Sequence, residues 1–475
     1  MNVLLINPPV IRAEKRLPAA VVRSLFYNSP PLGLAYLAAV LEQDGHRVTI
    51  LDAPVLGATA GDVAARAAVE RPDLVGLTST TAYFDTALAV AERLKAALPG
   101  VPICLGGPHF NANTDLLTAR RCFDFGIRGE GEITLREVVR GMTDGRELAD
   151  VPGVVTARNG DLFHAPERPL LADLDVLPLP ARHLLPIHAY RPMPNDQYRL
   201  PKTSMITSRG CPCACTFCDK QTFGNRYRSH GPARIVEEVH RLEADYGIRD
   251  IAFVDSTFTP NRRRTEAVLD AMEADPPRAS WTCSCRANVL TEDLLRRMRA
   301  MNCWRIRIGI ESGNAEILRG IRKGITRDDV ERTAQAADRL GFQVKAFFMI
   351  GHPGETRATI EDSIRFALDL PLKDVTVQIN TPLRGTPQFE ECGRRGTLLS
   401  ADQSQYSFFR PVFIPAGLTA EDLVAAHRRF YRRFYLRPVV FWRHLKAIRG
   451  PSDVAKYLRA VPLVFSLLFS RRDVA

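Results

Sequence analysis

The chain has 475 residues, 45% of them hydrophobic, which is enough for two or three globular domains and excludes a small disulfide-stabilised scaffold. Its ten cysteines do not form an extracellular disulfide pattern, because four of them lie within residues 211–218. The formal net charge of +11 is concentrated in residues 427–475, which hold twelve Lys or Arg and two Asp or Glu, so the rest of the chain is nearly neutral.

Residues 1–150 alternate short apolar runs with helical periodicity. The first run begins at once, so we expect a buried strand there rather than a signal peptide. The alternation predicts a doubly wound, Rossmann-like parallel sheet, which binds ligands at the carboxyl ends of its strands. The predicted strands are 3–6, 48–51, 74–77 and 103–105, and the predicted helices are 33–43, 60–69 and 86–97.

Small and polar residues follow the strand-like runs of this region. Such residues let a backbone approach a ligand closely, although any one Gly-Gly pair after a strand is usually an ordinary turn. The candidate ligand-binding residues are Asn7, Ser79, Thr80, Gly106, Gly107, Gly129 and Glu130.

Residues 151–200 contain eight prolines. Proline at this density interrupts long helices and central strands. We therefore expect a connector between two domains.

The segment 207–220 carries the strongest chemical signal in the chain. Cys211, Cys215 and Cys218 have the spacing C-x3-C-x2-C, and Phe217 precedes the last of them. Three thiolates on one loop can hold three irons of a [4Fe-4S] cluster and leave the fourth iron open to a small molecule. A structural zinc site is the alternative, but no second ligand pair lies nearby. Cys213 could belong to a different set of three ligands, but the spacing favours Cys211, Cys215 and Cys218, so we expect that Cys213 does not bind iron.

Residues 201–387 repeat a strand–helix unit six times. This repetition predicts a partial (β/α)6 barrel, whose chemistry belongs at the carboxyl ends of the strands. The predicted strands are 204–207, 250–254, 280–283, 305–308, 344–350 and 374–379, and the predicted helices are 233–246, 262–274, 292–301, 327–340 and 356–370.

Four of these strands are followed by residues suited to binding a polar ligand. Each residue alone has a structural alternative, such as a helix cap, a surface ion pair or a turn. Their order behind the cysteine loop favours one common site. Cys283 and Cys285 form a C-x-C that we expect in the core. The candidates are Asp255, Ser256, Arg286, Glu311, Ser312 and Gly351.

The cysteine spacing and these strand ends resemble the radical S-adenosyl-L-methionine (radical SAM) superfamily. The resemblance implies that Cys211, Cys215 and Cys218 hold a [4Fe-4S] cluster and that the strand ends bind SAM. It implies Asp255 and Ser256 at the SAM amino group, Arg286 at the carboxylate, Glu311 and Ser312 at the ribose, Gly351 at the adenine, and Phe217 beside the SAM.

The loops of residues 1–150, in this order ahead of the cysteine loop, resemble the cobalamin-binding domain of cobalamin-dependent radical SAM enzymes. Cobalamin domains that supply a histidine to the cobalt carry D-x-H-x-x-G, whereas residues 52–57 place Pro54 at the histidine position. Because proline cannot ligate cobalt, we expect no histidine from this loop on the lower face of cobalamin. His46 and His109 are expected to be surface or turn residues rather than ligands.

The resemblance covers residues 3–440 and implies a C-methyltransferase that acts on an unactivated carbon through a 5′-deoxyadenosyl radical and methylcobalamin. One alternative is a non-methylating cyclase or oxidoreductase of the anaerobic magnesium-protoporphyrin cyclase type, and another is a non-enzymatic iron–sulfur or cobalamin sensor. A methylthiotransferase is disfavoured, because the first 200 residues hold only Cys104 and Cys122. The expected partners are a small-molecule substrate and an electron donor such as flavodoxin or ferredoxin. A lipid-like or tetrapyrrole substrate would suit a tail that rests on membranes, and a peptide or antibiotic intermediate is the open alternative. No nucleic acid is expected.

Residues 388–475 are expected to form a basic, largely helical extension. Segments 427–435, 441–442 and 461–469 mix cations with aromatic and aliphatic residues, a composition that suits a helix on an anionic bilayer. The slightly favoured alternative is a basic cap whose apolar side packs on the barrel. Since the apolar run 460–469 is shorter than the roughly 20 residues of a spanning helix, we expect a cytoplasmic protein, free or at the inner membrane face.

Overall fold

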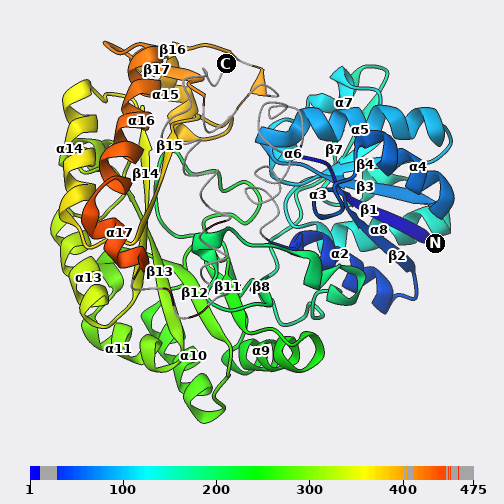
Figure 1. Cartoon of the computed structure of the whole chain (residues 1–475). Coiled ribbons are helices and arrows are strands. Elements are labelled where there is room, and N and C mark those ends of the chain that lie inside the picture. Colours follow the sequence, from blue (N-terminus) through cyan, green and yellow to red (C-terminus); the bar gives the residue numbers. More distant parts are fainter. Residues whose placement is uncertain are drawn as a thin grey trace. The chain divides into compact units, whose positions relative to one another are not determined.

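The computed structural model describes residues 1–10, 29–400, 402–403, 406, 410–445, 448, 450 and 458. The chain divides into two compact units (Figure 1). Most of the predicted connector packs with the first unit, which continues to Arg191. No described helix is long and apolar enough to cross a membrane. The N-terminal unit comprises Met1–Arg191, Lys220–Arg228 and Gln403–Gln405, and the C-terminal unit comprises Pro192–Asp219, Ser229–Asp402 and Tyr406–Ala475.

The N-terminal unit is built on a seven-stranded sheet in the order β2-β1-β3-β4-β5-β6-β7. Strands β1 to β5 are parallel, with α2 beside α8 on one face and α4 beside α5 on the other (Figure 1). This order confirms the doubly wound prediction and puts a topological switch point between β1 and β3. The elements are β1 (Asn2–Asn7), α2 (Leu32–Gln43), β2 (Arg47–Asp52), α4 (Ala60–Glu70), β3 (Leu74–Thr78), α5 (Phe84–Ala97), β4 (Ile103–Gly106), β5 (Phe125–Ile127) and α8 (Gly131–Asp144).

Strand β5 and a hairpin at the edge of this sheet escaped the prediction from sequence. The hairpin strands β6 (Val154–Arg158) and β7 (Asp161–His164) are antiparallel and lie inside the predicted connector. Asn159 and Gly160 make the turn, with φ of 53° and 92°. An Asn-Gly pair with two positive φ values is the signature of a type I′ hairpin turn. The pair was a usable signal, which the density of prolines obscured.

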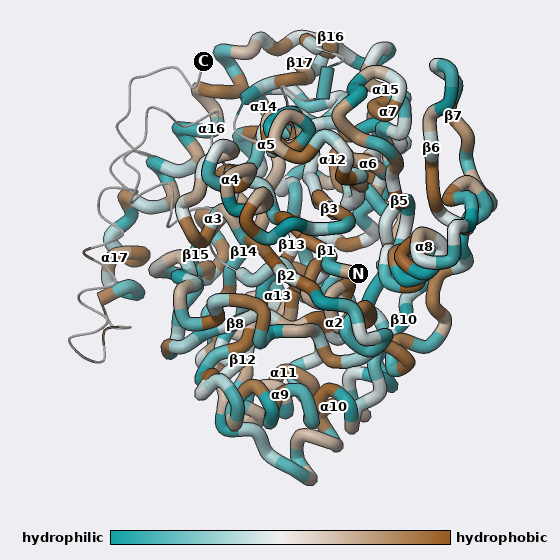
Figure 2. Tube along the Cα trace, turned by 90° about the vertical axis from the view of Figure 1, so that its right-hand side faces the viewer, coloured by the Kyte–Doolittle hydropathy of each residue, from teal (hydrophilic) through white to brown (hydrophobic). Residues whose placement is uncertain are grey.

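The C-terminal unit contains a six-stranded parallel sheet in the order β15-β14-β13-β12-β11-β8, which confirms the predicted partial barrel. Its outer helices, such as α9 and α10, alternate hydrophobic and hydrophilic residues, as amphipathic helices do (Figure 2). The elements are β8 (Lys202–Met205), α9 (Pro232–Tyr246), β11 (Asp250–Phe253), α10 (Arg262–Ala274), β12 (Ser280–Cys285), α11 (Glu292–Ala300), β13 (Cys303–Glu311), α12 (Ala315–Gly320), α13 (Arg327–Arg339), β14 (Gln343–Ile350), α14 (Arg357–Asp369) and β15 (Asp374–Ile379).

A buried ion network occupies the end of the barrel where its strands begin. Arg305 lies 2.8 Å from Asp374 and 2.9 Å from Asp196, and Lys345 lies 3.0 Å from Asp196. Lys202 and Asp250 form a further buried pair at 3.1 Å. Burial alone would raise the pKa of Asp196, but Lys345 and Arg305 hold it well below its usual range. Opposite charges therefore stabilise this end of the barrel by pairing.

Helix α16 (Ala420–Tyr435) covers the free edge of β15. The Tyr431 hydroxyl accepts from the Val377 N–H (3.0 Å) and the Tyr435 hydroxyl from the Val375 N–H (3.3 Å). His427 Nε2 lies 3.0 Å from the Val377 carbonyl oxygen. These side chains recur every four residues and satisfy an edge that would otherwise invite pairing with another strand. The aromatic residues of segment 427–435 thus face the barrel, as the packed-cap alternative expected.

The other elements after the barrel are helices and one small ladder. Strands β16 and β17 pair antiparallel, an element that the predicted helical extension did not include. Residues 461–469 lie outside the described part of the chain. The elements are α15 (Pro387–Arg395), β16 (Gly396–Leu398), β17 (Phe413–Pro415) and α17 (Pro438–Leu445).

Candidate cofactor sites

The predicted ligand-binding residues of the N-terminal unit lie at the carboxyl ends of its parallel strands. Asn7 ends β1, Ser79 and Thr80 follow β3, and Gly106 ends β4. Gly107 has φ of 91°, and a Cβ there would lie 2.9 Å from the Ser79 backbone, so the two loops approach too closely for any side chain. Ser79 is buried and Thr80 is exposed. This edge contains the β1/β3 switch point, where such sheets bind their ligands.

Asp52 links three parts of this edge. Its carboxylate accepts from Asn7 Nδ2 (2.7 Å) and from the Tyr190 hydroxyl (2.6 Å). Burial raises the pKa of Asp52, although the two hydrogen bonds partly oppose that shift. Pro54 lies inside the short helix α3 (Ala53–Leu56), where it offers no donor to a metal. Sequence reasoning missed Tyr190, because the connector gave no sign that it returns to this edge.

The two histidines considered as cobalt ligands are engaged elsewhere. His109 is buried in α6 (Pro108–Ala112), with its ring 4.3 Å from that of Phe84 and its Nδ1 3.1 Å from Thr81 Oγ1. The expectation of a surface or turn position is therefore wrong for His109, because aromatic packing draws the ring into the core. His46 Nδ1 lies 3.4 Å from the amino group of Met1, at the start of β1 rather than its end.

The cysteine loop is held by hydrogen bonds and packing within the C-terminal unit. The Thr216 N–H donates to the Ile321 carbonyl and the Gln388 N–H to the Thr216 carbonyl, both at 3.0 Å. The Phe217 ring packs against a small apolar cluster that includes Ile317 and Ile321. Between these anchors Cys215 is buried, Cys211 and Cys213 are half-buried and Cys218 is exposed.

The loop has the donor set of an iron–sulfur site. In the described residues no three His, Cys, Asp or Glu side chains converge on one metal ion. A cubane cluster binds each thiolate to a different iron, so it does not require such convergence. A hydrogen bond with Cys211, together with burial, raises the pKa of Cys213. The Arg286 guanidinium acts on the same thiol in the opposite direction, so Arg286 lies near the loop.

Asp255 is bound to the chain that leads into the cysteine loop. Its carboxylate accepts from the Thr207 N–H (2.7 Å), the Thr207 hydroxyl and the Ser208 N–H (3.1 Å). Ser256, the next residue, is exposed. The end of β11 therefore orients the entry to the loop, in addition to any contact with a ligand.

Glu311 and Lys323 form a buried ion pair at the end of β13. Their charged atoms are 2.7 Å apart, and each side chain is 10% exposed. A Cβ on Gly309 would lie 2.5 Å from Glu311 Oε1 and 2.8 Å from Lys323 Nζ, so the pair needs a glycine beneath it. Arg286 donates to the carbonyls of Lys323 and Gly324, which brings the ends of β12 and β13 together. Lys323 was missed in the sequence, where a lysine after a short helix resembles a surface residue.

The end of β14 carries a buried polar group that the sequence analysis did not include. Gly351 has φ of 88°, and Glu355 accepts from the Gly351 N–H and from the His352 N–H (3.0 Å). Burial raises the pKa of Glu355 to about 8 and lowers that of His352 to about 3. The His352 ring lies 5.6 Å from that of Phe217, and its Nδ1 lies 3.1 Å from Gln388 Nε2.

Several buried polar atoms at this end have no hydrogen-bond partner in the described structure. They include His352 Nε2, Glu355 Oε1, Asn380 Oδ1 and Gln388 Oε1. Unpaired buried polar atoms are costly, so they favour a polar ligand here. Ser312 instead faces α14, with its hydroxyl 3.1 Å from that of Ser363. Cys283 and Cys285 are buried in β12, with their sulfurs 3.4 Å apart, as expected for core residues.

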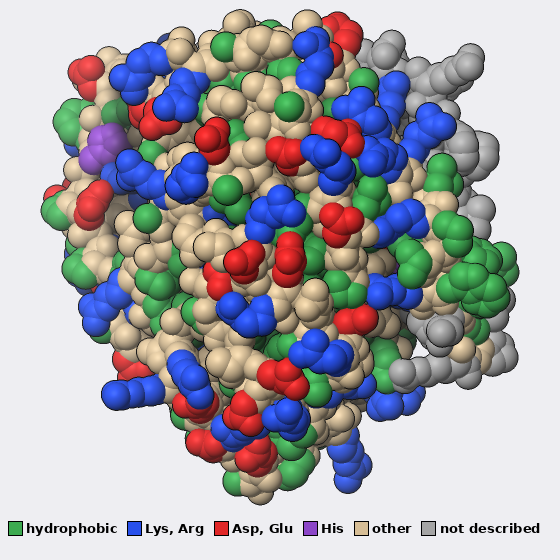
Figure 3. Space-filling view, turned by 90° about the vertical axis from the view of Figure 1, so that its left-hand side faces the viewer, with side chains coloured by type: hydrophobic (Ala, Val, Ile, Leu, Met, Phe, Trp, Pro, Cys, Tyr) green, Lys and Arg blue, Asp and Glu red, His purple; other side chains and the backbone are tan. Residues whose placement is uncertain are grey.

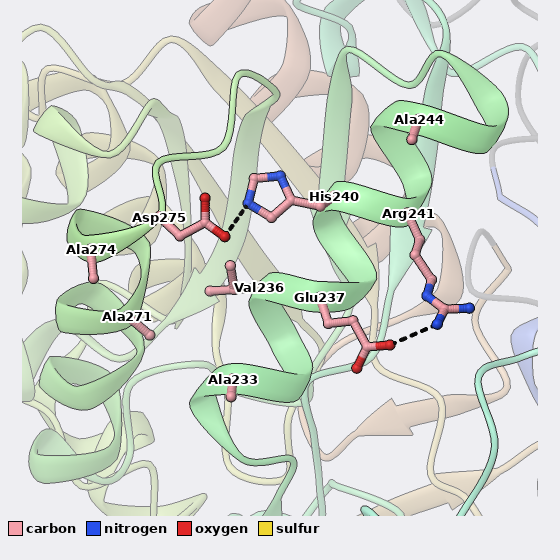
Figure 4. Close-up of a pocket in the computed structure, with 9 residues that line it drawn as sticks. All are labelled: Ala233, Val236, Glu237, His240, Arg241, Ala244, Ala271, Ala274 and Asp275. Carbon is pink, nitrogen blue, oxygen red and sulfur yellow. Dashed lines mark ion pairs between the residues drawn. The ribbon is translucent and has the colours of Figure 1, made fainter.

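A groove of about 620 Å³ lies on the outer side of the barrel, between α9 and α10 (Figure 4). Its alanines, such as Ala233 and Ala271, leave the space open. His240 faces Asp275 across it at 3.0 Å. The groove contains none of the predicted site residues, so it is separate from the strand ends.

Comparison with known proteins agrees with both sheets. A model of the radical SAM superfamily matches residues 205–367, and a model of the B12 binding domain matches residues 18–139. An uncharacterized methyltransferase of Pyrococcus horikoshii is 35% identical over 462 residues, covering 95% of this chain and 98% of the relative. The anaerobic magnesium-protoporphyrin IX monomethyl ester cyclase of Rubrivivax gelatinosus is 26% identical over 418 residues, covering 86% and 74%.

Solved structures support the same fold. The radical S-adenosylmethionine methyltransferase TsrM from Kitasatospora setae, with cobalamin and a [4Fe-4S] cluster bound, matches with a TM-score of 0.69 at 20% identity, covering 98% of this chain and 90% of that chain. The fold and the cysteine loop thus define a radical SAM protein with a B12-binding domain. The chain belongs to the cobalamin-dependent radical SAM family.

Proposed function

We propose that the chain is a C-methyltransferase that acts on an unactivated carbon, with a [4Fe-4S] cluster, SAM and cobalamin as cofactors. One observation carries the proposal: a single chain joins a three-thiol loop at the open end of a barrel to a B12-binding fold with small residues at its switch point. When bound, the cluster and SAM supply a radical that removes a hydrogen atom, and cobalamin supplies the methyl group.

The residues of the C-terminal unit divide the work of holding the cluster and SAM. We assign the irons to Cys211, Cys215 and Cys218, and we assign the SAM carboxylate to Arg286, a fixed cation close to the loop. Glu311 accepts hydrogen bonds from the ribose, with Lys323 holding its carboxylate in place. Asp255 and Ser256 serve the amino group, Ser312 supports the ribose site from its buried position, and Gly351 and Phe217 border the adenine.

Cobalamin is assigned to the carboxyl edge of the N-terminal sheet. Its small loop residues admit a large ring, and Asn7, which donates to Asp52, lies at the switch point. Because Pro54 stands at the histidine position, cobalt receives no histidine from α3. The assigned residues are Asn7, Ser79, Thr80, Gly106, Gly107, Gly129 and Glu130.

Product analysis tests the reaction. Anaerobically reconstituted protein, given SAM, cobalamin and a reductant, is expected to release S-adenosylhomocysteine together with 5′-deoxyadenosine when substrate is present. Release of 5′-deoxyadenosine and methionine alone would favour the cyclase alternative, which the similarity to the Rubrivivax gelatinosus protein supports. Absence of any SAM cleavage would favour a sensor.

The substrate and the electron donor are proposed by class. One electron must reach the cluster for each SAM cleaved, which a flavodoxin or ferredoxin supplies. A lipid-like or tetrapyrrole substrate suits a protein that contacts an anionic membrane surface.

Helix α17 is the segment that supports the proposed membrane contact. Phe441 is 64% exposed and Trp442 56%, and Val439 and Leu445 are exposed beside them. Figure 3 shows hydrophobic side chains gathered near basic ones on this face. Sedimentation with phosphatidylglycerol vesicles tests the contact: F441E/W442E should reduce binding, whereas equal binding of both proteins would exclude this helix.

A further inference from the structure

Residues Lys220–Arg228, here called the return segment, leave one unit for the other directly after the cysteine loop. Asp219 belongs to the C-terminal unit, Lys220 to the N-terminal unit, and Ser229 to the C-terminal unit again. Only Asp219 separates Cys218 from this segment. Neither the sequence motifs nor the proposed chemistry gives the segment a role.

Arg228 anchors the end of the return segment through a buried ion pair. Its Nη1 donates to Glu130 Oε1 (2.9 Å), to Glu130 Oε2 (2.7 Å) and to the Leu171 carbonyl (2.8 Å), and its Nη2 donates to the Phe223 carbonyl (3.1 Å). The Leu171 N–H also donates to Glu130 Oε2 (3.0 Å). The side chains of Arg228 and Glu130 are 2% and 5% exposed. Both carboxylate oxygens of Glu130 are therefore bound by protein.

Thr222 provides a second anchor on the same loop. Its hydroxyl accepts from Asn111 Nδ2 (2.7 Å), and Asn111 Oδ1 accepts from the Gly129 N–H (2.9 Å). Gly224 has φ of 69°, and a Cβ there would lie 2.8 Å from Leu170. The return segment is thus fixed at two points to residues 129–130, directly after β5.

The short link to Cys218 leaves little slack. Thr222, the nearer anchor, lies four residues beyond Cys218, and four residues of fully extended chain span at most about 14 Å. The Gly224 N–H also donates to the Lys220 carbonyl (2.7 Å), which folds the start of the segment and shortens that reach. A shift of the loop after β5 by a few ångström is therefore either taken up by bending of residues 219–221 or passed on to the third cysteine. The fixed contacts of the return segment therefore give a physical route by which a shift of the loop after β5 reaches Cys218.

We propose that Glu130 and Arg228 are positioning residues for the cysteine loop, and that they transmit occupancy of the cobalamin site to Cys218. This inference rests on the proposed function, which assigns the loop after β5 to cobalamin. It adds a positioning role for the Glu130 side chain to the assignment of Glu130 to the cobalamin site. A positioning pair on this loop would make the cluster site sensitive to whether cobalamin is bound.

Hydrogen exchange of the full-length, iron-loaded protein tests the proposal, with R228M as the variant. Breaking a buried pair strongly destabilises its surroundings, so amides of residues 211–228 should exchange at least roughly tenfold faster in R228M. Hydroxocobalamin should slow their exchange in the wild type and have no effect on them in R228M. R128M is the matched control, since its pair with Glu167 is solvent-exposed and should leave exchange unchanged.

Exchange at wild-type rates in R228M would overturn the proposal. So would an acceleration spread evenly over residues 1–191, because the pair would then support the fold and nothing more. If R228M fails to fold, R228K retains the cation but loses the fork of donors, and the acceleration should still be confined to residues 211–228.

A second readout follows the cluster itself. The EPR spectrum of the reduced cluster should change when hydroxocobalamin is added to the wild type and should not change in the variant; identical responses in both would contradict the transmission. If the wild type binds no hydroxocobalamin, the proposed function fails, and the exchange of R228M without cobalamin still decides the positioning role.

Discussion

The two ends of the barrel solve the problem of buried charge in different ways. Where the strands begin, Asp196, Arg305 and Lys345 lie within 3.0 Å of an opposite charge. Where the strands end, the carboxylates of Asp255 and Glu355 are held by backbone N–H groups instead. The first end has its charges matched by other side chains. At the second end Glu311 pairs with Lys323, whereas Asp255 and Glu355 are oriented by backbone N–H groups, which leaves these two side chains able to respond to a ligand.

The two ends should also respond differently to substitution. At the paired end, each charge is needed by its partner, so the expected effect of a change is on stability. At the other end, Gly309 leaves space for the Glu311–Lys323 pair, and Gly351 has a positive φ. The expected effect there is on ligand binding. Such a division agrees with barrels in general, whose chemistry lies at the carboxyl ends of the strands.

The largest expected effect comes from removing a thiol at the ligand-binding end. Replacing Cys211, Cys215 or Cys218 with alanine should abolish SAM cleavage, because the cluster loses an iron ligand. Iron and sulfide content, together with 5′-deoxyadenosine release, measures this loss. C213A is the matched control and should retain both. Loss of the cluster in C213A, or its retention in one of the other variants, would show that a different trio binds the irons.

Asp196→Asn, at the end where the strands begin, should lower stability without affecting SAM cleavage. The change leaves Arg305 and Lys345 short of a carboxylate, and breaking such a pair costs about 3 kcal/mol of unfolding free energy. Guanidinium unfolding of the apo protein measures the loss. Asp293→Asn, in an exposed pair with Arg296, is the control and should change stability by less than about 1 kcal/mol. If folded Asp196→Asn protein no longer cleaves SAM, the paired end of the barrel affects the chemistry as well as the stability, contrary to the division proposed here.

Sequence periodicity was sufficient for most of the barrel. The predicted helix 262–274 is α10 as observed, and the predicted strand 374–379 is β15. Apolar spacing fixes such elements because each buries one face or both. The C-x3-C-x2-C spacing likewise predicts the cluster loop, since the proposed ligands are close in sequence.

Partners that are distant in sequence could not be predicted in this way. Tyr190 reaches Asp52 across 138 residues and Arg228 reaches Glu130 across 98, and no local pattern encodes either meeting. Lys323 lies only 12 residues beyond Glu311, but its burial depends on the course of α12. A glycine inside a strand was the one available clue, because Gly309 marks a close approach by other atoms.

Gly309→Ala tests whether a substitution where the strands end weakens SAM binding. The added methyl group would displace the Glu311–Lys323 pair, and overpacking of this kind costs about 1–3 kcal/mol. Because Glu311 is assigned to the SAM ribose, a cost of this size borne by the SAM site corresponds to a roughly 5- to 150-fold loss of SAM affinity, measured by anaerobic equilibrium dialysis. Gly320→Ala, which has no atom within 4 Å of its Cβ, is the control. Unchanged SAM binding in Gly309→Ala would mean that the ion pair does not belong to the SAM site.

The smallest expected effect is a pH dependence that arises from the end of β14. The pKa of Glu355 is raised to about 8 in the folded protein, so the folded state keeps a proton that the unfolded state releases above its ordinary pKa of 4.5. Stability from this group therefore falls as the pH rises from about 4.5 to about 8. The pKa of His352 is lowered to about 3, so its contribution falls in the opposite direction, as the pH drops below 6.5.

As the pH rises above 6.5, His352 becomes neutral in both states, so of these two groups only Glu355 contributes a slope. That slope is about 1.4 kcal/mol of unfolding free energy per pH unit, lost as the pH rises towards 8. Glu355→Gln removes the titrating group but keeps an oxygen for the Gly351 and His352 N–H groups, so its unfolding free energy should be flatter than that of the wild type between pH 6.5 and 8. Chemical unfolding at several pH values measures both slopes. An equal slope in the variant would mean that Glu355 is charged in the folded protein, and the ligand-binding end would then tolerate a buried carboxylate on backbone N–H groups alone.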